Sequence, residues 1–218
     1  MSSRNSEVET NLREVEAEIA SFDPTLIVVT KTYPISDVEI LYGLGVRNFG
    51  ENRSSEGIEK SASIAGTWHY QGEIQSKKIR EILSWADCLH SLDNQGHLEK
   101  IARALQESQS QVNLFLQLSL DGDPDRGGLQ EAELFALAEK VSAISEINLL
   151  GVMSVPPVRY EPEAAFKEIG AIHQRFIAHF PQAPFLSAGM SGDYMIALEH
   201  GATHIRVGSK ILGARSYR

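Results

Sequence analysis

The regular alternation of short apolar runs with helix-compatible segments constrains the fold of this chain most. Eight runs rich in aliphatic, β-branched or aromatic residues have the length and composition of strands, and each precedes a segment suited to a helix. The runs span residues 25–30, 46–50, 67–72, 87–92, 112–120, 147–153, 184–189 and 203–208. Eight strand–helix pairs predict an α/β fold with a parallel sheet, most economically a closed (β/α)8 barrel of the TIM type. An open doubly wound sheet is the alternative.

The helical segments fill the gaps between these runs. They are predicted at 36–44, 52–64, 75–86, 94–108, 129–144, 162–180 and 191–202, with a short closing turn at 209–218 and an exposed, acidic helix before the first strand. Nothing along the chain resembles a linker, a repeat or a low-complexity tract. Because single barrels commonly have about 200–250 residues, we expect residues 1–218 to form one domain.

Charge and cysteine content narrow the class of protein. The formal net charge of -9 argues against binding to nucleic acid and to an anionic membrane surface. We see no signal peptide and no apolar run long enough to span a membrane. Cys88 is the only cysteine and cannot form an internal disulfide, which is typical of a reducing compartment. We therefore expect a cytoplasmic protein.

Small residues follow the seventh and eighth predicted strands, where barrels often hold phosphate. The sequences are SAGMSGD at 187–193 and RVGS at 206–209. Backbone N–H groups at two helix starts, together with the Ser191 and Ser209 hydroxyls, would form an anion site. Each serine could instead serve only as the N-cap of its own helix.

Lys31 lies at the end of the first predicted strand, on the same rim as these loops. Its side chain could simply extend along the barrel edge into solvent. Alternatively, its amine could form a Schiff base, which lysines do when burial or neighbouring cations make them nucleophilic. An aldehyde that carries a phosphate would suit both the lysine and the anion site. Pyridoxal 5'-phosphate (PLP) is such a compound.

Two further side chains could approach a ligand at this rim. Arg206 precedes Gly208 by two residues, so both lie on one face of the eighth strand. The guanidinium could reach beneath a bound ring or form a salt bridge inside the barrel. Asn52 follows the second strand and could donate to a ring substituent, or serve as the N-cap of the next helix.

Other cofactor chemistry has little support in the sequence. No GxGxxG pattern follows an early strand, which disfavours a flavin or nicotinamide site. The seven histidines are scattered, and no HExxH or paired-cysteine spacing is present. We therefore expect no metal site.

Seven segments occur together in an order typical of one family. They are TKTYP at 30–34, FGEN at 49–52, WHYQG at 68–72, QSKK at 75–78, GVMSVPP at 151–157, LSAGMSGDY at 186–194 and RVGSKILGAR at 206–215. From residue 26 to 215 the chain resembles the pyridoxal phosphate homeostasis protein family, also called YggS-like. The resemblance implies an alanine racemase N-terminal barrel with PLP held as a Schiff base on Lys31. It also implies that Ser191, Gly208 and Ser209 contact the phosphate, that Arg206 faces the pyridine nitrogen, and that Asn52 lies near the cofactor.

The chain departs from the family pattern at four positions. Gln71 replaces a usually apolar residue, Lys77 a common asparagine, Arg126 a usual lysine, and Ser209 a more frequent threonine. None of these removes an expected cofactor contact. They concern the rim around the cofactor and the other ligands that come near it.

The resemblance favours a cofactor-handling protein over an efficient enzyme. An arginine is donor-only, so a ring nitrogen facing it is a weak electron sink. A racemase also needs acid–base groups on both faces of its substrate. Tyr33, Tyr70, His69 and His204 are conceivable second groups, and the chain ends shortly after the barrel. We expect a monomer that binds PLP and serves PLP homeostasis, with PLP-dependent apo-enzymes as candidate recipients. A slow amino-acid racemase and a Schiff-base aldolase for phosphorylated sugars are the alternatives.

Overall fold

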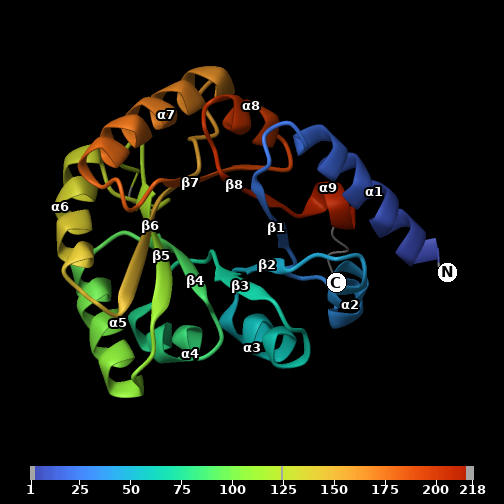
Figure 1. The fold of residues 1–218 in the computed structure, drawn as a ribbon, viewed down its shortest axis with the longest axis horizontal. Coiled ribbons are helices and arrows are strands. Elements are labelled where there is room, and N and C mark those ends of the chain that lie inside the picture. The colour runs from blue at the N-terminus through green and yellow to red at the C-terminus, as the bar shows by residue number, and fades with distance from the viewer. Residues whose placement is uncertain (1–2, 124, 215–218) are drawn as a thin grey trace.

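The computed structural model describes residues 3–123 and 125–214. Its eight strands are all parallel and close into a barrel in sequence order, with β8 pairing with β1 (Figure 1). The strands are β1 (Thr25–Val29), β2 (Asn48–Glu51), β3 (Thr67–Tyr70), β4 (Cys88–Leu92), β5 (Val112–Leu118), β6 (Ile147–Ser154), β7 (Phe185–Met190) and β8 (His204–Val207). The predicted (β/α)8 barrel is confirmed, and the open sheet is excluded.

The strands are buried on both faces, which explains their composition. β4 is buried at all five positions, and Ile27 and Val28 in β1 are fully buried. A parallel strand in a barrel has the barrel interior on one side and a helix layer on the other. This burial selects near-continuous apolar runs such as LIVV at 26–29 instead of an alternating pattern.

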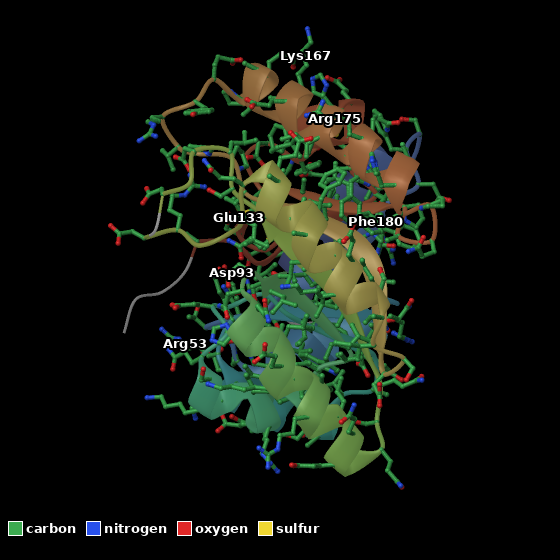
Figure 2. All side chains as sticks on the ribbon, turned by 90° about the vertical axis from the view of Figure 1, so that its left-hand side faces the viewer. Arg53, Asp93, Glu133, Lys167, Arg175 and Phe180 are labelled. Atoms are coloured by element: carbon green, nitrogen blue, oxygen red, sulfur yellow. The ribbon has the colours of Figure 1, made fainter. Side chains whose placement is uncertain are left out.

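Helices follow each strand and form the outer layer (Figure 1). They are α1 (Ser3–Ile19), α2 (Ile35–Gly43), α3 (Ser54–Ser63), the 3-10 turn η1 (Ser76–Lys78), α4 (Ile79–Leu83), α5 (Gln95–Ser108), α6 (Glu131–Ser142), α7 (Pro162–His179), α8 (Tyr194–Glu199) and α9 (Ser209–Leu212). In α5, Leu98, Ile101 and Leu105 form the buried stripe, and the Asn94 side chain accepts from the His97 N–H as N-cap. Figure 2, turned by 90° from Figure 1, shows this layer from the side of α5, α6 and α7, with Lys167 of α7 at the upper edge.

Two predicted helices differ from the observed ones. The segment predicted at 75–86 is divided between η1 and the short α4, and the segment predicted at 191–202 becomes helical only at Tyr194. The predicted closing turn contains α9, while residues 215–218 lie outside the described residues.

The N-terminal helix is not an exposed appendage, as the sequence had suggested. Val8, Leu12 and Val15 of α1 are fully buried. Their four- and three-residue spacing gives α1 one apolar face, which packs against α9 and α2 (Figure 1). Polar contacts complete the joint, because Lys210 forms an ion pair with Glu18 at 2.7 Å. The abundance of glutamate in α1 masked this buried face. In the part of the chain that the structure describes, no helix combines the length and apolarity needed to cross a bilayer.

Candidate functional site

A cavity of about 290 Å³ lies among the carboxyl ends of the strands. Its walls contain all six residues that the sequence singled out: Lys31, Asn52, Ser191, Arg206, Gly208 and Ser209. The other lining residues are Val29, Gln71, Met153, Val155, Met190 and Gly192. The cavity therefore brings together side chains from β1 and β8 and from the loops after β2, β3, β6 and β7. A larger hollow of about 640 Å³ between α1 and α2 lies outside this set of strand ends.

Ser191 connects the two loops that were predicted to hold an anion. Its Oγ accepts hydrogen bonds from the backbone N–H groups of Gly208, at 3.2 Å, and Lys210, at 3.4 Å. The N-cap of α8 is Asp193, so the alternative that Ser191 caps its own helix is wrong. The Ser191 hydroxyl instead lies against the start of α9, where two donors already converge on one oxygen.

Two glycines allow these loops to approach each other. Gly189 has a φ of +91°, and a Cβ there would lie 2.7 Å from the Ala197 Cβ. At Gly208 an added Cβ would lie 3.0 Å from the Val29 carbonyl oxygen. A larger residue at position 189 would push the end of β7 away from α8, and one at position 208 would push the end of β8 away from β1.

On the Lys31 side of the cavity, a buried ion pair holds the preceding residue. The Lys60 ammonium donates to the Thr30 carbonyl oxygen at 2.8 Å and to Glu51 Oε1 at 2.7 Å. The Thr30 hydroxyl donates to the same Glu51 oxygen at 2.6 Å. Lys60 and Glu51 come from α3 and β2, so this pair fixes the end of β1 from the neighbouring strand–helix unit.

The residue after Lys31 is held by the same network. Thr32 has a φ of +69°, an uncommon conformation for a threonine, and its N–H donates to Glu56 Oε2 at 2.6 Å. Glu56 Oε2 also lies 3.2 Å from the Lys60 ammonium. The backbone on both sides of Lys31 is therefore held by one network, because Thr30 is bonded to Lys60 and Thr32 to Glu56.

The carboxylates of this network have perturbed pKa values in opposite directions. Burial raises the pKa of Glu51, although Lys60 and Thr30 act against it. The buried Glu51 Oε2 has no hydrogen-bond partner, in agreement with that direction. At Glu56, burial raises the pKa but is outweighed by the Thr32 N–H and Lys60, so the pKa is lowered overall.

Arg206 forms the floor of the cavity and is bound by neutral groups. One terminal nitrogen donates to the Ser187 carbonyl oxygen at 2.8 Å and to Ser187 Oγ at 2.7 Å, and the other to the Ser154 carbonyl oxygen at 3.1 Å. No carboxylate among the described residues forms an ion pair with Arg206, so the predicted alternative of an internal salt bridge is wrong. Burial lowers the pKa of Arg206 to about 10, which leaves it charged at neutral pH.

Asn52 and Gln71 form the wall after β2 and β3. The Asn52 amide donates to the Gln71 carbonyl oxygen at 3.4 Å. The N-cap of α3 is Arg53, so Asn52 is not the cap of that helix. Gln71 Nε2 is buried without a hydrogen-bond partner. An unpaired buried donor in a cavity wall is a position where a bound acceptor would be stabilised.

The four candidate second acid–base groups do not line this cavity. Tyr33 donates to the Gly213 carbonyl oxygen, and Tyr70 to that of Glu73. Burial raises the pKa of Tyr70 to about 12 and lowers that of His204 to about 4. His69 is buried inside the barrel. None of the four belongs to the lining of the cavity that contains Lys31.

The other departures from the family pattern lie near the cavity or at the surface. Arg126 lines a second cavity of about 620 Å³ that shares Gln71, Met153 and Val155 with the first. Lys77 is exposed on η1. These positions alter the surroundings of the site and leave its six predicted residues in place.

Sequence reasoning missed the residues that support Lys31 and Arg206. Glu51 lies next to Asn52 in the FGEN segment, and Lys60 follows Glu56 by four residues, which places the two on one helix face. That spacing predicts a contact between Lys60 and Glu56, but it does not indicate that Lys60 reaches β1. Nothing in the sequence indicated a role for Ser187, because its partners His90 and Arg206 are on β4 and β8, far from it in the chain.

Comparisons with known proteins agree with the geometry. The family described as alanine racemase, N-terminal domain, matches residues 4–216. A pyridoxal phosphate homeostasis protein of Corynebacterium glutamicum is 38% identical over 198 residues, covering 87% of this chain and 90% of the relative. One of the same name from Vibrio cholerae is 32% identical and covers 96% of this chain and 97% of the relative.

Solved structures show the same architecture. PipY of Synechococcus elongatus with PLP bound superposes with a TM-score of 0.86 at 30% identity, covering 94% of this chain and 100% of that chain. Alanine racemase of Clostridium difficile has a TM-score of 0.80 at 13% identity, covering 94% of this chain and 56% of that one. The second likeness concerns the fold alone.

Proposed function

This chain belongs to the pyridoxal phosphate homeostasis protein family, and we propose that it binds PLP reversibly on Lys31 and serves PLP homeostasis. The observation that carries the proposal is the cavity in which Lys31, Ser191, Arg206, Gly208 and Ser209 meet. PLP is also the ligand in the solved PipY structure.

The residues of the cavity fit PLP in size and in chemistry. A volume of about 290 Å³ lies just below the range for ligand pockets, roughly 300–1,000 Å³, as suits a small cofactor. Lys31 supplies the one primary amine in its described lining, and the start of α9 supplies N–H donors beside Ser191. The orphaned Gln71 amide adds a donor to the wall. A primary amine opposite a group of anion-binding donors matches a phosphorylated aldehyde.

We assign each residue one task. The Lys31 amine holds the aldehyde carbon, and the Thr30 and Thr32 contacts orient its backbone. The Ser191 and Ser209 hydroxyls and the N–H of Gly208 hold the phosphate, for which Ser191 would turn from its present α9 partners. Arg206 offers only donors to the ring, and Asn52 approaches from the β2 side. When bound, PLP supplies a reactive aldehyde and an electron-withdrawing ring.

The surroundings of Lys31 support handling of the cofactor over turnover of an amino acid. Efficient racemisation needs a second acid–base group opposite the lysine. Tyr33, Tyr70, His69 and His204 lie outside the lining of the cavity. Arg206 has no lone pair, so it cannot accept a hydrogen bond from a protonated ring nitrogen. We further propose that the protein acts as a monomer in the cytoplasm, with PLP-dependent apo-enzymes as recipients.

A spectroscopic titration tests the covalent site. Purified protein mixed with PLP should gain a visible band distinct from that of PLP alone, and borohydride should fix the cofactor to Lys31 in a peptide map. Lys31→Ala should remove both signals, while Lys167→Ala, at the outer edge of α7 (Figure 2), should keep them. A wild-type protein without the band, or a label on another lysine, would contradict the proposal.

The racemase alternative requires a separate measurement. PLP-loaded protein would be incubated with single enantiomers of amino acids in deuterated water. Exchange of the α-proton that Lys31→Ala abolishes would establish the alternative. No exchange above the rate of PLP alone is the result we expect.

A further inference from the structure

A row of buried polar side chains crosses the barrel interior behind Arg206. The distances are 2.7 Å from the Arg206 guanidinium to Ser187 Oγ, and 3.0 Å from Ser187 Oγ to His90 Nδ1. They continue with 2.9 Å from His90 Nε2 to His69 Nδ1, and 3.1 Å from His69 Nε2 to Asn48 Oδ1. The row starts at the cavity floor on β8 and ends at the first residue of β2. It passes through β7, β4 and β3 (Figure 1).

Both imidazoles in this row are neutral. Burial lowers the pKa of His69 to about 3 and that of His90 well below its usual value. The nearby His204 acts in the same direction on both, and Arg206 does so on His90. A neutral imidazole has one donor nitrogen and one acceptor nitrogen. Each ring must therefore donate a hydrogen bond in one of its two contacts and accept a hydrogen bond in the other.

The Asn48 end fixes which nitrogen carries each hydrogen. Asn48 Oδ1 can only accept, so His69 Nε2 donates to it and His69 Nδ1 accepts. His90 Nε2 must then donate to His69, which leaves His90 Nδ1 to accept from the Ser187 hydroxyl. Every hydrogen in the row is thereby placed.

The Arg206 end is consistent with that order. A guanidinium only donates, and Ser187 Oγ can accept from it while giving its own hydrogen to His90. In the reverse order the Ser187 hydroxyl would lose His90 as its acceptor. All the bonds therefore run away from Arg206. Their acceptor ends face a buried cation that has no ion-paired carboxylate among the described residues, and aligned hydrogen bonds strengthen one another.

A metal site is the competing interpretation of the same residues. Ligand atoms of His69, Cys88 and His90 lie within 4.8 Å of one another. However, all four imidazole nitrogens already have hydrogen-bond partners. Burial also raises the pKa of the Cys88 thiol, which disfavours the thiolate that a metal requires. The group is therefore better described as a hydrogen-bonded chain.

We propose that His69 and His90, both as Nε2–H tautomers and linked through Ser187, are positioning residues that hold the Arg206 guanidinium at the cavity floor. The chain gives the Ser187 hydroxyl an acceptor in His90, so that the Ser187 oxygen lone pairs face Arg206. The role towards PLP rests on the proposed function, whereas the tautomers and their coupling to Ser187 do not.

Nitrogen-15 NMR of histidine-labelled protein, with and without added PLP, tests the order of the hydrogens. We expect both rings to be neutral Nε2–H tautomers at pH 7. Ser187→Ala should shift the Nδ1 signal of His90, which loses its donor. Ser54→Ala is the control, because this buried hydroxyl accepts from the Trp85 indole N–H and has no contact with the row. Nδ1–H tautomers, a charged ring or an equal shift in both variants would overturn the proposal.

PLP binding tests the positioning role. Ser187→Ala should raise the dissociation constant of PLP about tenfold and change the absorption of the bound cofactor, since one hydrogen bond to a charged group is lost. Ser187→Thr, which keeps a hydroxyl, should restore both, and Ser54→Ala should not reproduce the spectral change. An unchanged dissociation constant in Ser187→Ala with correct tautomers would overturn the positioning role. A wild-type protein that binds no PLP would instead refute the proposed function and leave the tautomer result intact.

Discussion

The two sides of the cavity are built from opposite kinds of interaction. On the Lys31 side, the Lys60 ammonium and the carboxylates of Glu51 and Glu56 form a charged network. On the Arg206 side, one buried cation is bound by two carbonyl oxygens and the Ser187 hydroxyl, and two neutral imidazoles continue the row behind that hydroxyl. On the charged side, the positive charge of Lys60 is compensated by neighbouring carboxylates. On the neutral side, the charge of Arg206 is stabilised only by oriented hydrogen-bonding groups. Mutations on the two sides should therefore lower the free energy of unfolding for different reasons.

Acid should affect Glu51 on the charged side and the buried histidines on the neutral side with opposite sign. The raised pKa of Glu51 means that the folded protein takes up a proton there before the unfolded chain does. Its contribution to stability grows as the pH falls. The lowered pKa values of His69 and His90 mean that the unfolded chain takes up protons first, so their contribution is lost as the pH falls.

The largest effect should come from breaking the charged side. Lys60→Met leaves Glu51 fully buried without its cation and removes the donor to the Thr30 carbonyl. Removing one partner of a buried ion pair costs about 3–5 kcal/mol. Urea unfolding at pH 7 measures this loss of the free energy of unfolding.

A double variant separates the charge from the packing in this prediction. Glu51→Gln combined with Lys60→Met should recover at least half of the loss, because no charge is then left buried without a partner. Lys78→Met removes an exposed pair with Glu81 and should cost less than about 1 kcal/mol. A double variant no more stable than Lys60→Met would show that the charge is not the cause.

The next effect is the response of the neutral side to pH. The pKa of His69 is about 3 when folded, against about 6.5 when unfolded, so its stabilisation is complete above pH 6.5 and declines below it. Between pH 6.5 and 5 we expect a loss of about 2 kcal/mol from this residue. The measurement is urea unfolding across that range for wild type and His69→Asn, whose slope should be smaller.

Two controls locate that pH dependence. His179→Gln, at the exposed end of α7, should keep the slope of the wild type. Glu51→Gln should steepen the loss on acidification, because it removes the contribution of opposite sign. Equal slopes for wild type and His69→Asn would contradict the assignment of a buried neutral ring.

The sequence was sufficient for the barrel and for six of the twelve residues that line its cavity. Eight runs with strand composition predict the fold, and the loops at 187–193 and 206–209 predict where Ser191 and Gly208 meet. These inferences succeed because each motif consists of residues close together in the chain. The carboxyl ends of parallel strands also lie at the same end of the barrel, which brings the motifs together. Whether the lining residues hold PLP remains the prediction that the Lys31 experiment tests.

The supporting networks could not be derived in this way. His90 meets Ser187 across 97 positions of sequence, and Lys60 reaches Thr30 across 30. Such contacts depend on the stagger of strands around the barrel and on which face of a strand points inward. A single histidine or lysine in the sequence gives no information about either, so the contact between His69 and His90 could not be predicted.

The smallest effect should come from the rim of the charged side. Glu56→Gln keeps an oxygen to accept from the Thr32 N–H but removes the charge near Lys60, and Glu56 is partly exposed. The cost should be about 1 kcal/mol in urea unfolding. Glu56→Ala should cost more, since the Thr32 N–H loses its acceptor at a residue with a φ of +69°. Equal losses in the two variants would mean that Glu56 acts through its charge and not by holding the backbone beside Lys31.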